Sequence, residues 1–256
     1  MIPKETLAEL HDSVRPIDLA QTTLPSNLRL LVLAPHPDDF DEIAVSLKNF
    51  QSLGVEIGLL VLTGASSGVL DSFANPPTRE SKQAIREREQ RAALDFFGLP
   101  QKSVKFLYLP EDDHGELALT RSTQETVSTH FKSFNPDIVT LPYGHDTNSG
   151  HQRTFLLLRE IGRSSDKPLL ALYQKDPKTI SIQLEAYMAF DESIAAWKGE
   201  MLRFHQSQQT RNLATRHHGI DERILRVNRD IAQELGIQFP YAEGFQIELF
   251  GHPRNT

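Results

Sequence analysis

The stretch LRLLVLAPHPDDFDE, residues 28–42, decides how the rest of the chain is interpreted. Its first seven residues are apolar apart from Arg29, which predicts a strand buried on both faces. One histidine and four acids follow at once. Two interpretations compete: either the acids cap the next helix, or some of them hold a metal ion together with His36.

Short apolar runs alternate with helical patterns through most of the chain. The expected strands span residues 28–34, 55–63, 103–110, 137–144 and 168–174, and the expected helices span 41–54, 79–98, 122–134 and 151–163. This alternation is typical of a parallel sheet with helices on both faces. We therefore predict an α/β fold, a Rossmann-like three-layer sandwich.

The pattern changes after residue 175. We expect an antiparallel or edge strand at 179–190, one helix through 192–208, another over 220–236 and a closing strand at 244–250. These pieces, about residues 176–256, are interpreted as completing a single domain that spans 1–256. Residues 1–25 are interpreted as an N-terminal extension.

Composition excludes several classes of protein. A net charge of −7 without a cluster of Lys and Arg argues against a nucleic-acid partner. The absence of cysteine excludes disulfides, thiolate zinc sites and a cysteine nucleophile, so any metal must be held by His, Asp or Glu. The start of the chain lacks the apolar core of a signal peptide, and no apolar run approaches the roughly 18 residues of a membrane span. A cytoplasmic protein with a small-molecule substrate is expected, and its oligomeric state is left open.

Three polar clusters follow expected strands, at residues 36–39, 111–114 and 145–151. Ligands of open parallel sheets bind beyond the carboxyl ends of the strands, so these loops are expected to converge. His36, one neighbouring aspartate and a distant histidine would supply three ligands and leave a fourth position for water. This is the pattern of a catalytic zinc, and the second aspartate could take the water's proton.

Six segments resemble, in the right order, the PIG-L/LmbE-like de-N-acetylases, zinc enzymes that remove acetyl groups from N-acetylglucosamine-type amides. The segments are APHPDDFDE, VLTGASSG, AIREREQRAALDFFGLP, LPEDDHGEL, KGEMLRFHQSQ and YAEGFQI. Each alone is weak evidence, but together they cover about residues 28–250.

The resemblance implies a division of roles among the residues of the first and third clusters. The family's metal ligands fall on His36, Asp39 and His151, and its general base falls on Asp38. The implied reaction is zinc-dependent hydrolysis of the N-acetyl group of an N-acetylglucosamine-type sugar or its conjugate. Metal-bound water would attack while Asp38 takes the proton.

The sequence departs from the family pattern at three positions. Phe40 stands where the family has Glu, Asn148 where it has His, and Gly150 where it has Asp. These changes leave the implied ligands and base in place but affect the stabilisation of the oxyanion. We expect Asn148 or His145 to stabilise it instead.

Several polar residues allow both a functional and a structural interpretation. Arg86 could contact a sugar or phosphate, or belong to a solvated helix face. Asp112 and Asp113 could line the substrate pocket or form a turn. Asp41 and Glu42 are expected to complement the positive end of a helix.

The remaining histidines are given no chemistry. We interpret His205, together with Gln208, as making structural polar contacts. The pair at 217–218 is expected at the surface, and His11, His130 and His252 receive no role.

Two alternatives to the implied deacetylase stay open. The chain could be an amidase acting on another N-acyl conjugate. It could also be a non-catalytic sugar-binding relative, since the departures at Phe40, Asn148 and Gly150 would fit lost turnover.

Overall fold

The computed structural model describes residues 14–25 and 27–251. Within these residues one eight-stranded sheet runs in the order β1-β7-β8-β6-β5-β2-β3-β4. Its strands are β1 (Ile17–Asp18), β2 (Arg29–Ala34), β3 (Glu56–Val61), β4 (Val104–Phe106), β5 (Ile138–Pro142), β6 (Leu169–Gln174), β7 (Ala186–Phe190) and β8 (Tyr241–Phe250). All neighbours are parallel except β8, which is antiparallel to both β6 and β7. The predicted α/β fold is confirmed.

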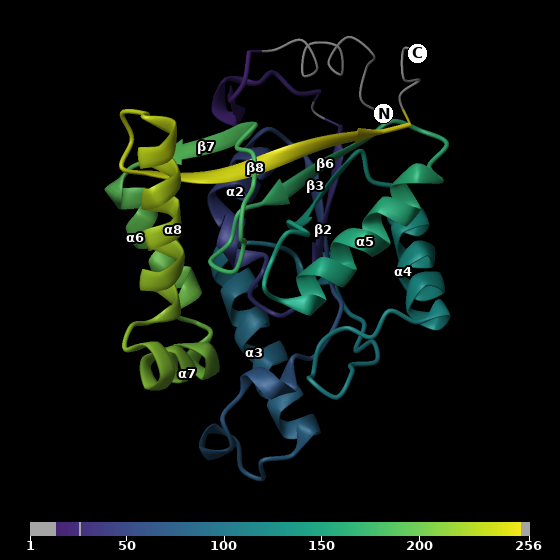
Figure 1. Ribbon diagram of the computed structural model, residues 1–256, viewed down its shortest axis with the longest axis vertical. Helices are drawn as coiled ribbons and strands as arrows, with labels where there is room; N and C mark the ends of the chain where they lie inside the picture. The colour runs from purple at the N-terminus through teal and green to yellow at the C-terminus, as the bar shows by residue number, and fades with distance from the viewer. Residues whose placement is uncertain (1–13, 26, 252–256) are drawn as a thin grey trace.

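Helices cover both faces of the sheet (Figure 1). They are α2 (Ala44–Ser52), α3 (Arg79–Phe97), α4 (Arg121–Phe134), α5 (Ser149–Arg163), α6 (Glu192–Leu202), α7 (Gln206–Arg216) and α8 (Ile220–Leu235). Short 3-10 turns are η1 (Leu19–Gln21), η2 (Asp41–Ile43), η3 (Ser66–Gly68), η4 (Asp71–Phe73) and η5 (Gln101–Ser103). In Figure 1, α6, α7 and α8 gather at the left, while α4 and α5 lie at the right.

The central strand β2 shows why the opening stretch is apolar on both faces. Leu30 and Val32 pack into the cluster that contains side chains of α2, α3 and α6. Leu31 and Leu33 alternate with them and pack against α4 and α5. All four are at most 1% exposed, because successive side chains of a strand point to opposite faces.

The sheet has a topological switch point between β2 and β5. From β2 the chain continues to β3 on one side, whereas β5 lies on the other side of β2. The loops that follow these two adjacent strands therefore leave the sheet in different directions. Such a point is where parallel α/β sheets place their ligands.

The expected helix over 192–208 is wrong, because the chain forms two helices, α6 and α7. The break at residues 203–205 has a tertiary cause. Glu89 of α3 accepts hydrogen bonds from the Ser207 backbone N (2.7 Å) and Oγ (2.6 Å), which caps the new helix. No Gly or Pro marks this break in the sequence.

Two expected strands are much shorter in the structure than predicted. The strand expected over 103–110 ends at Phe106, and Tyr108 adopts a positive φ of 47° that no strand accommodates. The strand expected over 179–190 begins only at Ala186.

Asp41 and Glu42 lie in the first turn of η2, which continues directly into α2, as expected of acids at the positive end of a helix. Neither caps a helix through its side chain. Helix α2 is instead capped by Glu243 of β8, which accepts from the backbone N of Val45 (3.0 Å) and of Ser46 (2.7 Å). The acids at residues 41 and 42 are therefore free for other contacts.

None of the helices within the described ranges is long and apolar enough to cross a membrane. Residues 1–13 of the expected N-terminal extension lie outside these ranges, as do His11 and His252. The described part of the extension contributes β1, which pairs with β7.

Candidate metal centre and substrate cavity

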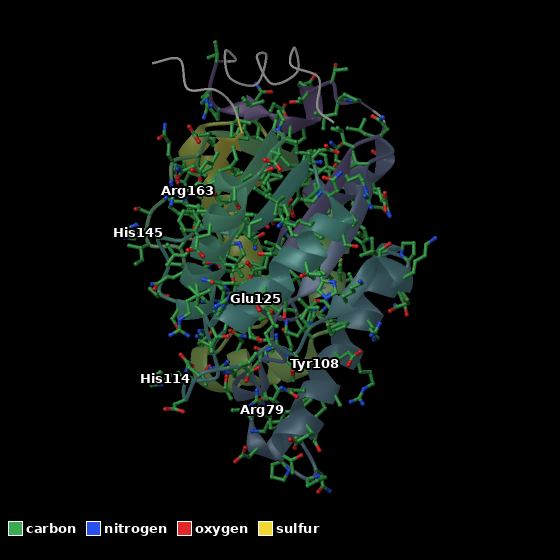
Figure 2. The ribbon with its side chains drawn as sticks, turned by 90° about the vertical axis from the view of Figure 1, so that its right-hand side faces the viewer. Arg79, Tyr108, His114, Glu125, His145 and Arg163 are labelled. Carbon is green, nitrogen blue, oxygen red and sulfur yellow. The ribbon has the colours of Figure 1, made fainter. Side chains whose placement is uncertain are left out.

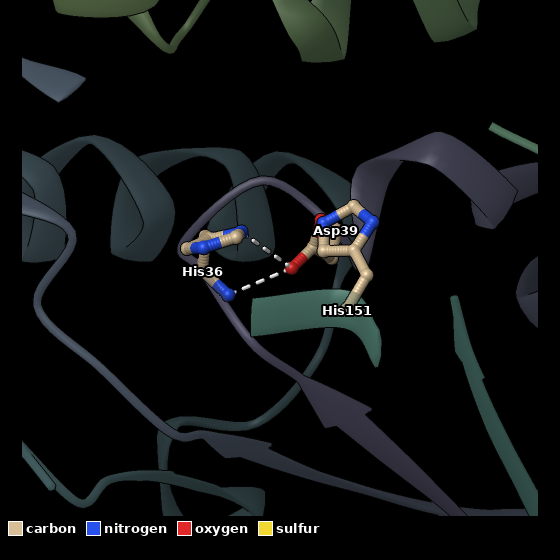
Figure 3. Close-up of side chains that lie close together, drawn as sticks. All are labelled: His36, Asp39 and His151. Carbon is tan, nitrogen blue, oxygen red and sulfur yellow. Dashed lines mark hydrogen bonds and ion pairs between the residues drawn. The ribbon is translucent and has the colours of Figure 1, made fainter. Parts of the chain in front are cut away.

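His36 and Asp39, from the loop after β2, meet His151, from the first turn of α5, in a buried cluster (Figure 3). Asp39 Oδ2 accepts from the His36 backbone N (2.7 Å) and lies 3.4 Å from His36 Nδ1. The other oxygen, Asp39 Oδ1, lies 3.4 Å from His151 Nε2. The structure thus brings together three residues that are up to 115 positions apart in the sequence.

Carboxylates behind the two imidazoles fix their orientation. His151 Nδ1 lies 3.1 Å from Asp146 Oδ2 and 2.9 Å from Asp176 Oδ2. On the other ring, His36 Nε2 lies 2.9 Å from Glu116 Oε2. In metal sites such partners hold a ligating histidine in one tautomer and turn its other nitrogen toward the ion.

The donor set fits a divalent metal. His151 Nε2 is buried without a hydrogen-bond partner, which is costly unless a ligand uses its lone pair. Ligand atoms of His36, Asp39 and His151 all lie within 4.8 Å of one another. Two imidazoles and one carboxylate are ligands that zinc accepts, with room left for a further ligand.

The electrostatics of the cluster match this chemistry. Burial by itself raises the pKa of Asp39, but His151 and His36 outweigh it and hold that pKa well below its usual value. Burial and Lys178 lower the pKa of His151, but Asp176 and Asp39 outweigh them and raise it well above its usual value. The cluster therefore stabilises positive charge at its centre.

Asp38 stands beside the cluster in a strained backbone conformation, with φ at 136°. Arg86 of α3 donates to Asp38 Oδ1 (2.9 Å) and also to the Pro37 carbonyl. Arg86 is only 2% exposed, so its interpretation as part of a solvated helix face is wrong. It holds the Asp38 loop and does not face bulk water.

A second buried network lies under the same loop. Asp41 accepts from Gln90 Nε2 (3.0 Å) and lies 2.5 Å from His205 Nε2. Gln208 Nε2 donates to the Gly68 carbonyl (2.9 Å). The predicted structural polar contacts of His205 and Gln208 are confirmed.

Two departures from the family pattern have packing explanations. Phe40 is fully buried and packs edge-on against Phe97, with ring centroids 5.0 Å apart. At Gly150 an added Cβ would lie 2.4 Å from Glu116 Oε2, so a side chain here would collide with that carboxylate. Gly150 leaves the space that Glu116 fills.

The structure places the two expected oxyanion donors differently. Asn148 is at the site: its Oδ1 caps α5 by accepting from His151 N (2.9 Å), and its Nδ2 donates to Glu116 Oε1 (2.8 Å). His145 is exposed, with Nδ1 lying 2.7 Å from Ser181 Oγ, and it projects from the surface in Figure 2. His145 is therefore not brought to the cluster.

Asp112 and Asp113 do not line the cavity of about 450 Å³ that opens beside the cluster. Asp112 accepts from the backbone N of His114 (2.9 Å) and Glu116 (3.1 Å), and Arg153 Nη1 donates to it (2.6 Å). The hydrogen bond from Arg153 leads the contacts that lower the pKa of Asp112 to about 2. Asp113 is exposed. Asp112 therefore forms a turn, as one of the two interpretations proposed. Its hydrogen bond from the backbone N of Glu116 helps to position that residue.

Sequence reasoning did not single out three site residues, Glu116, Asp176 and Lys178. Lys178 lines the cavity, and although burial lowers its pKa, Asp39 and Asp176 raise it above the usual value. Asp176 and Lys178 directly follow β6, at the same edge of the sheet as the other loops. The strand-end rule could have found these two, since β6 was an expected strand.

A cavity of about 450 Å³ opens beside the cluster. The acids among its lining residues, here called the acidic wall, are Asp38, Asp39, Glu42 and Glu116. The arginines among them, here called the arginine wall, are Arg211 and Arg216 of α7 and Arg223 of α8. Asp39 belongs both to the buried cluster and to this lining, so the cluster and the arginines border the same cavity.

A family model described as PIG-L, GlcNAc-PI de-N-acetylase, matches residues 31–161, just over half of the chain. The match includes His36, Asp38, Asp39 and His151. A search of curated protein sequences finds no match.

Solved structures share the fold at low identity. The N,N'-diacetylchitobiose deacetylase from Pyrococcus horikoshii gives a TM-score of 0.74 at 16% identity, over 96% of this chain and 92% of that one. The 4-carboxy-2-hydroxymuconate hydratase from Pseudomonas putida gives a TM-score of 0.67 at 18% identity, over 90% of this chain and 98% of the hydratase. The zinc-inhibited form of a teicoplanin deacetylase gives a TM-score of 0.65 at 13% identity, over 89% of this chain and 100% of that one. Deacetylases and a hydratase thus share this fold, and the fold alone does not decide the reaction.

Proposed function

This chain belongs to the PIG-L family of de-N-acetylases, and on that premise we propose that it hydrolyses the N-acetyl group of an N-acetylglucosamine-type sugar or conjugate with the help of zinc. One observation carries the proposal: a buried His36–Asp39–His151 cluster lies next to Asp38 on the wall of a cavity. Two solved structures with the same fold support the substrate class, because they are a diacetylchitobiose deacetylase and a teicoplanin deacetylase.

In this proposal His36, Asp39 and His151 hold the metal. When bound, zinc supplies Lewis-acid chemistry: it polarises an amide carbonyl and makes water acidic enough to ionise near pH 7. Asp146 and Asp176 keep the imidazole of His151 turned toward this position. Glu116 does the same for His36.

Asp38 is the general base in our proposal. Its carboxylate takes a proton from the water whose oxygen attacks the carbonyl carbon, and it returns that proton to the amide nitrogen as the C–N bond breaks. Acetate and a free amine are the products. Arg86 holds the carboxylate on the cavity side, so the base needs no rearrangement before it acts.

Two groups are placed to stabilise the oxyanion that develops on the carbonyl. Lys178 lines the cavity as a cation among the acids of the site. Asn148 lines it too, but its Nδ2 already donates to Glu116 Oε1. We assign the main role to Lys178, because its charge adds electrostatic stabilisation that a neutral amide lacks. His145 is left out, since it is exposed and bonded to Ser181.

Metal analysis and an acetate-release assay test the proposal together. We expect zinc at one ion per chain and turnover of N-acetylglucosamine conjugates. Asp38→Asn should lower turnover by about 10²–10⁴-fold while zinc content stays unchanged, because the base is removed and the three ligands remain. The matched control is Asp113→Asn, which alters an exposed aspartate that lies off the cavity.

The alternatives correspond to other outcomes of the same assay. Turnover confined to a different N-acyl conjugate would favour the broader amidase. Zinc-loaded protein that binds N-acetylglucosamine but hydrolyses no amide would favour the sugar-binding relative and overturn our proposal. Equal turnover of wild type and Asp38→Asn would reject Asp38 as the base.

A further inference from the structure

The arginine wall stands out in a chain whose net charge is −7. Three arginines line a cavity of about 450 Å³. They come from the second half of α7 and the beginning of α8, which are joined by the short segment 217–219. These helices are outside the segment that matches the family model, residues 31–161.

Among the described residues, none of the three arginines forms an ion pair. Arg216 Nη1 contacts only neutral oxygens, of Asn212 (3.3 Å) and Thr215 (3.3 Å). Nearby Arg203, by contrast, pairs with Asp221 at 2.8 Å. Buried Arg86 likewise pairs with Asp38. The arginine wall therefore lacks the acidic partners that arginines elsewhere in this region have.

The three charges are close enough to repel one another. Arg216 is exposed, and its slight burial, followed by the charges of Arg223 and Arg211, lowers its pKa. Converging cations without a counter-charge are unfavourable, and an anion between them would relieve the repulsion. The planar guanidinium group is suited to bidentate binding of carboxylate or phosphate oxygens.

The arginine wall is continuous with the candidate catalytic site. Arg211 also lines a smaller hollow together with His36, Asp38 and Lys178. Its Nη1 lies 3.4 Å from the position that a Cβ on Gly68 would occupy, and the Arg86 Nη1 lies 2.8 Å from the same point. A single ligand can therefore reach both the cluster and the arginines.

We infer that the substrate carries an oxyanion, a carboxylate or a phosphate, which Arg211, Arg216 and Arg223 bind while the N-acyl group lies at the His36–Asp39–His151 cluster. This inference rests on the proposed function for the placement of the amide. It adds the substrate class: an acidic conjugate of the amino sugar. The arginines act on binding and selection, away from the bond that breaks.

The test compares three substrates that differ in one substituent: methyl N-acetylglucosaminide, its carboxymethyl analogue and N-acetylglucosamine 1-phosphate. We expect kcat/KM to be at least tenfold higher for one or both anionic substrates than for the methyl glycoside. The preferred anion identifies carboxylate or phosphate as the natural group. Added NaCl should reduce the preference, because exposed charges are screened.

The double substitution Arg216→Gln/Arg223→Gln should lower the anionic-to-neutral ratio of kcat/KM by about tenfold or more, chiefly through KM, since hydrogen bonds to charged groups are lost. The matched control is Arg226→Gln, which removes an exposed arginine of α8 that does not line the cavity. It should keep the wild-type ratio. An unchanged ratio in the double variant, with the methyl glycoside still hydrolysed, would overturn the inference and leave the proposed function intact.

Binding of inorganic phosphate and of glycolate, measured by calorimetry, keeps the two proposals separable. If no amide is hydrolysed, tenfold weaker anion binding in the double variant but not in Arg226→Gln would still support the anion site. Equal binding in all three proteins would overturn it.

Discussion

Three of the four acids of the acidic wall have hydrogen-bond partners, whereas the arginine wall has no partner of opposite charge among the described residues. Asp38 is fixed by Arg86, Asp39 by the His36 backbone N, and Glu116 by Asn148. The arginines have only neutral contacts of their own helices or none. Groups that must meet a reacting bond need fixed positions, while groups that select a substituent can remain mobile until a ligand arrives.

The largest expected effect concerns the support behind the acidic wall. Lys198 is fully buried and donates to the Glu42 carbonyl (2.5 Å), Asn228 Oδ1 (2.8 Å) and Glu243 Oε1 (2.7 Å). Lys198→Met should cost about 3–5 kcal/mol of unfolding free energy, because it leaves the buried Glu243 carboxylate without its counter-charge. Urea denaturation measures the loss.

A surface pair provides the matched control for this experiment. Lys175 bonds Glu234 at 2.7 Å, and Glu234 is largely exposed. Lys175→Met should cost only about 0–1 kcal/mol. Similar losses in the two variants would show that the support behind the acidic wall is no stronger than a surface contact.

A smaller effect is expected behind the metal ligands. Asp176→Asn should weaken zinc binding by about 10–100-fold, because a carboxylate that orients His151 is lost while all three ligands remain. Competition with a chelator gives the affinity. Asp230→Asn, an exposed change on α8, is the control and should bind zinc like the wild type. Unchanged affinity in Asp176→Asn would assign the orientation of His151 to Asp146 alone.

The smallest effect is expected on the arginine wall. Arg216→Gln and Arg223→Gln should each change the unfolding free energy by less than about 0.5 kcal/mol, since no ion pair is broken and some repulsion is relieved. The same denaturation experiment measures it. A clear loss of stability in either variant would mean that these arginines support the fold, and it would remove the contrast between the two walls.

Local pattern was sufficient to predict the centre of the fold and the cluster. The stretch 28–34 is apolar at every position but one, as a strand covered on both faces requires. His36, Asp39 and His151 follow strands that the same rule identifies, and the sheet then brings them together. Hydrophobic periodicity and strand ends are local features of the sequence, so they can be predicted without the structure.

Contacts between distant segments explain what sequence reasoning missed. Asp41 is a first-turn acid, but its partner is His205, and the cap of α2 comes from Glu243, nearly two hundred residues away. Glu116 stands in an irregular loop and resembles any surface acid until Gly150 is seen to leave space for it. Local preference is weak and is overridden when a buried partner is available.

The position of β8 has a consequence for the order in which the protein can be assembled during synthesis. Strand β8 is the last in the chain but lies between β6 and β7, and it carries Glu243, which caps α2. A growing chain can pair β2, β3, β4, β5 and β6 as they emerge, but neither β7 nor the start of α2 can complete its final contacts before residue 243 has been made. The support that Glu243 gives to α2 and Lys198 is therefore added only after the other strands have been made, and a nascent chain that stops short of β8 lacks it.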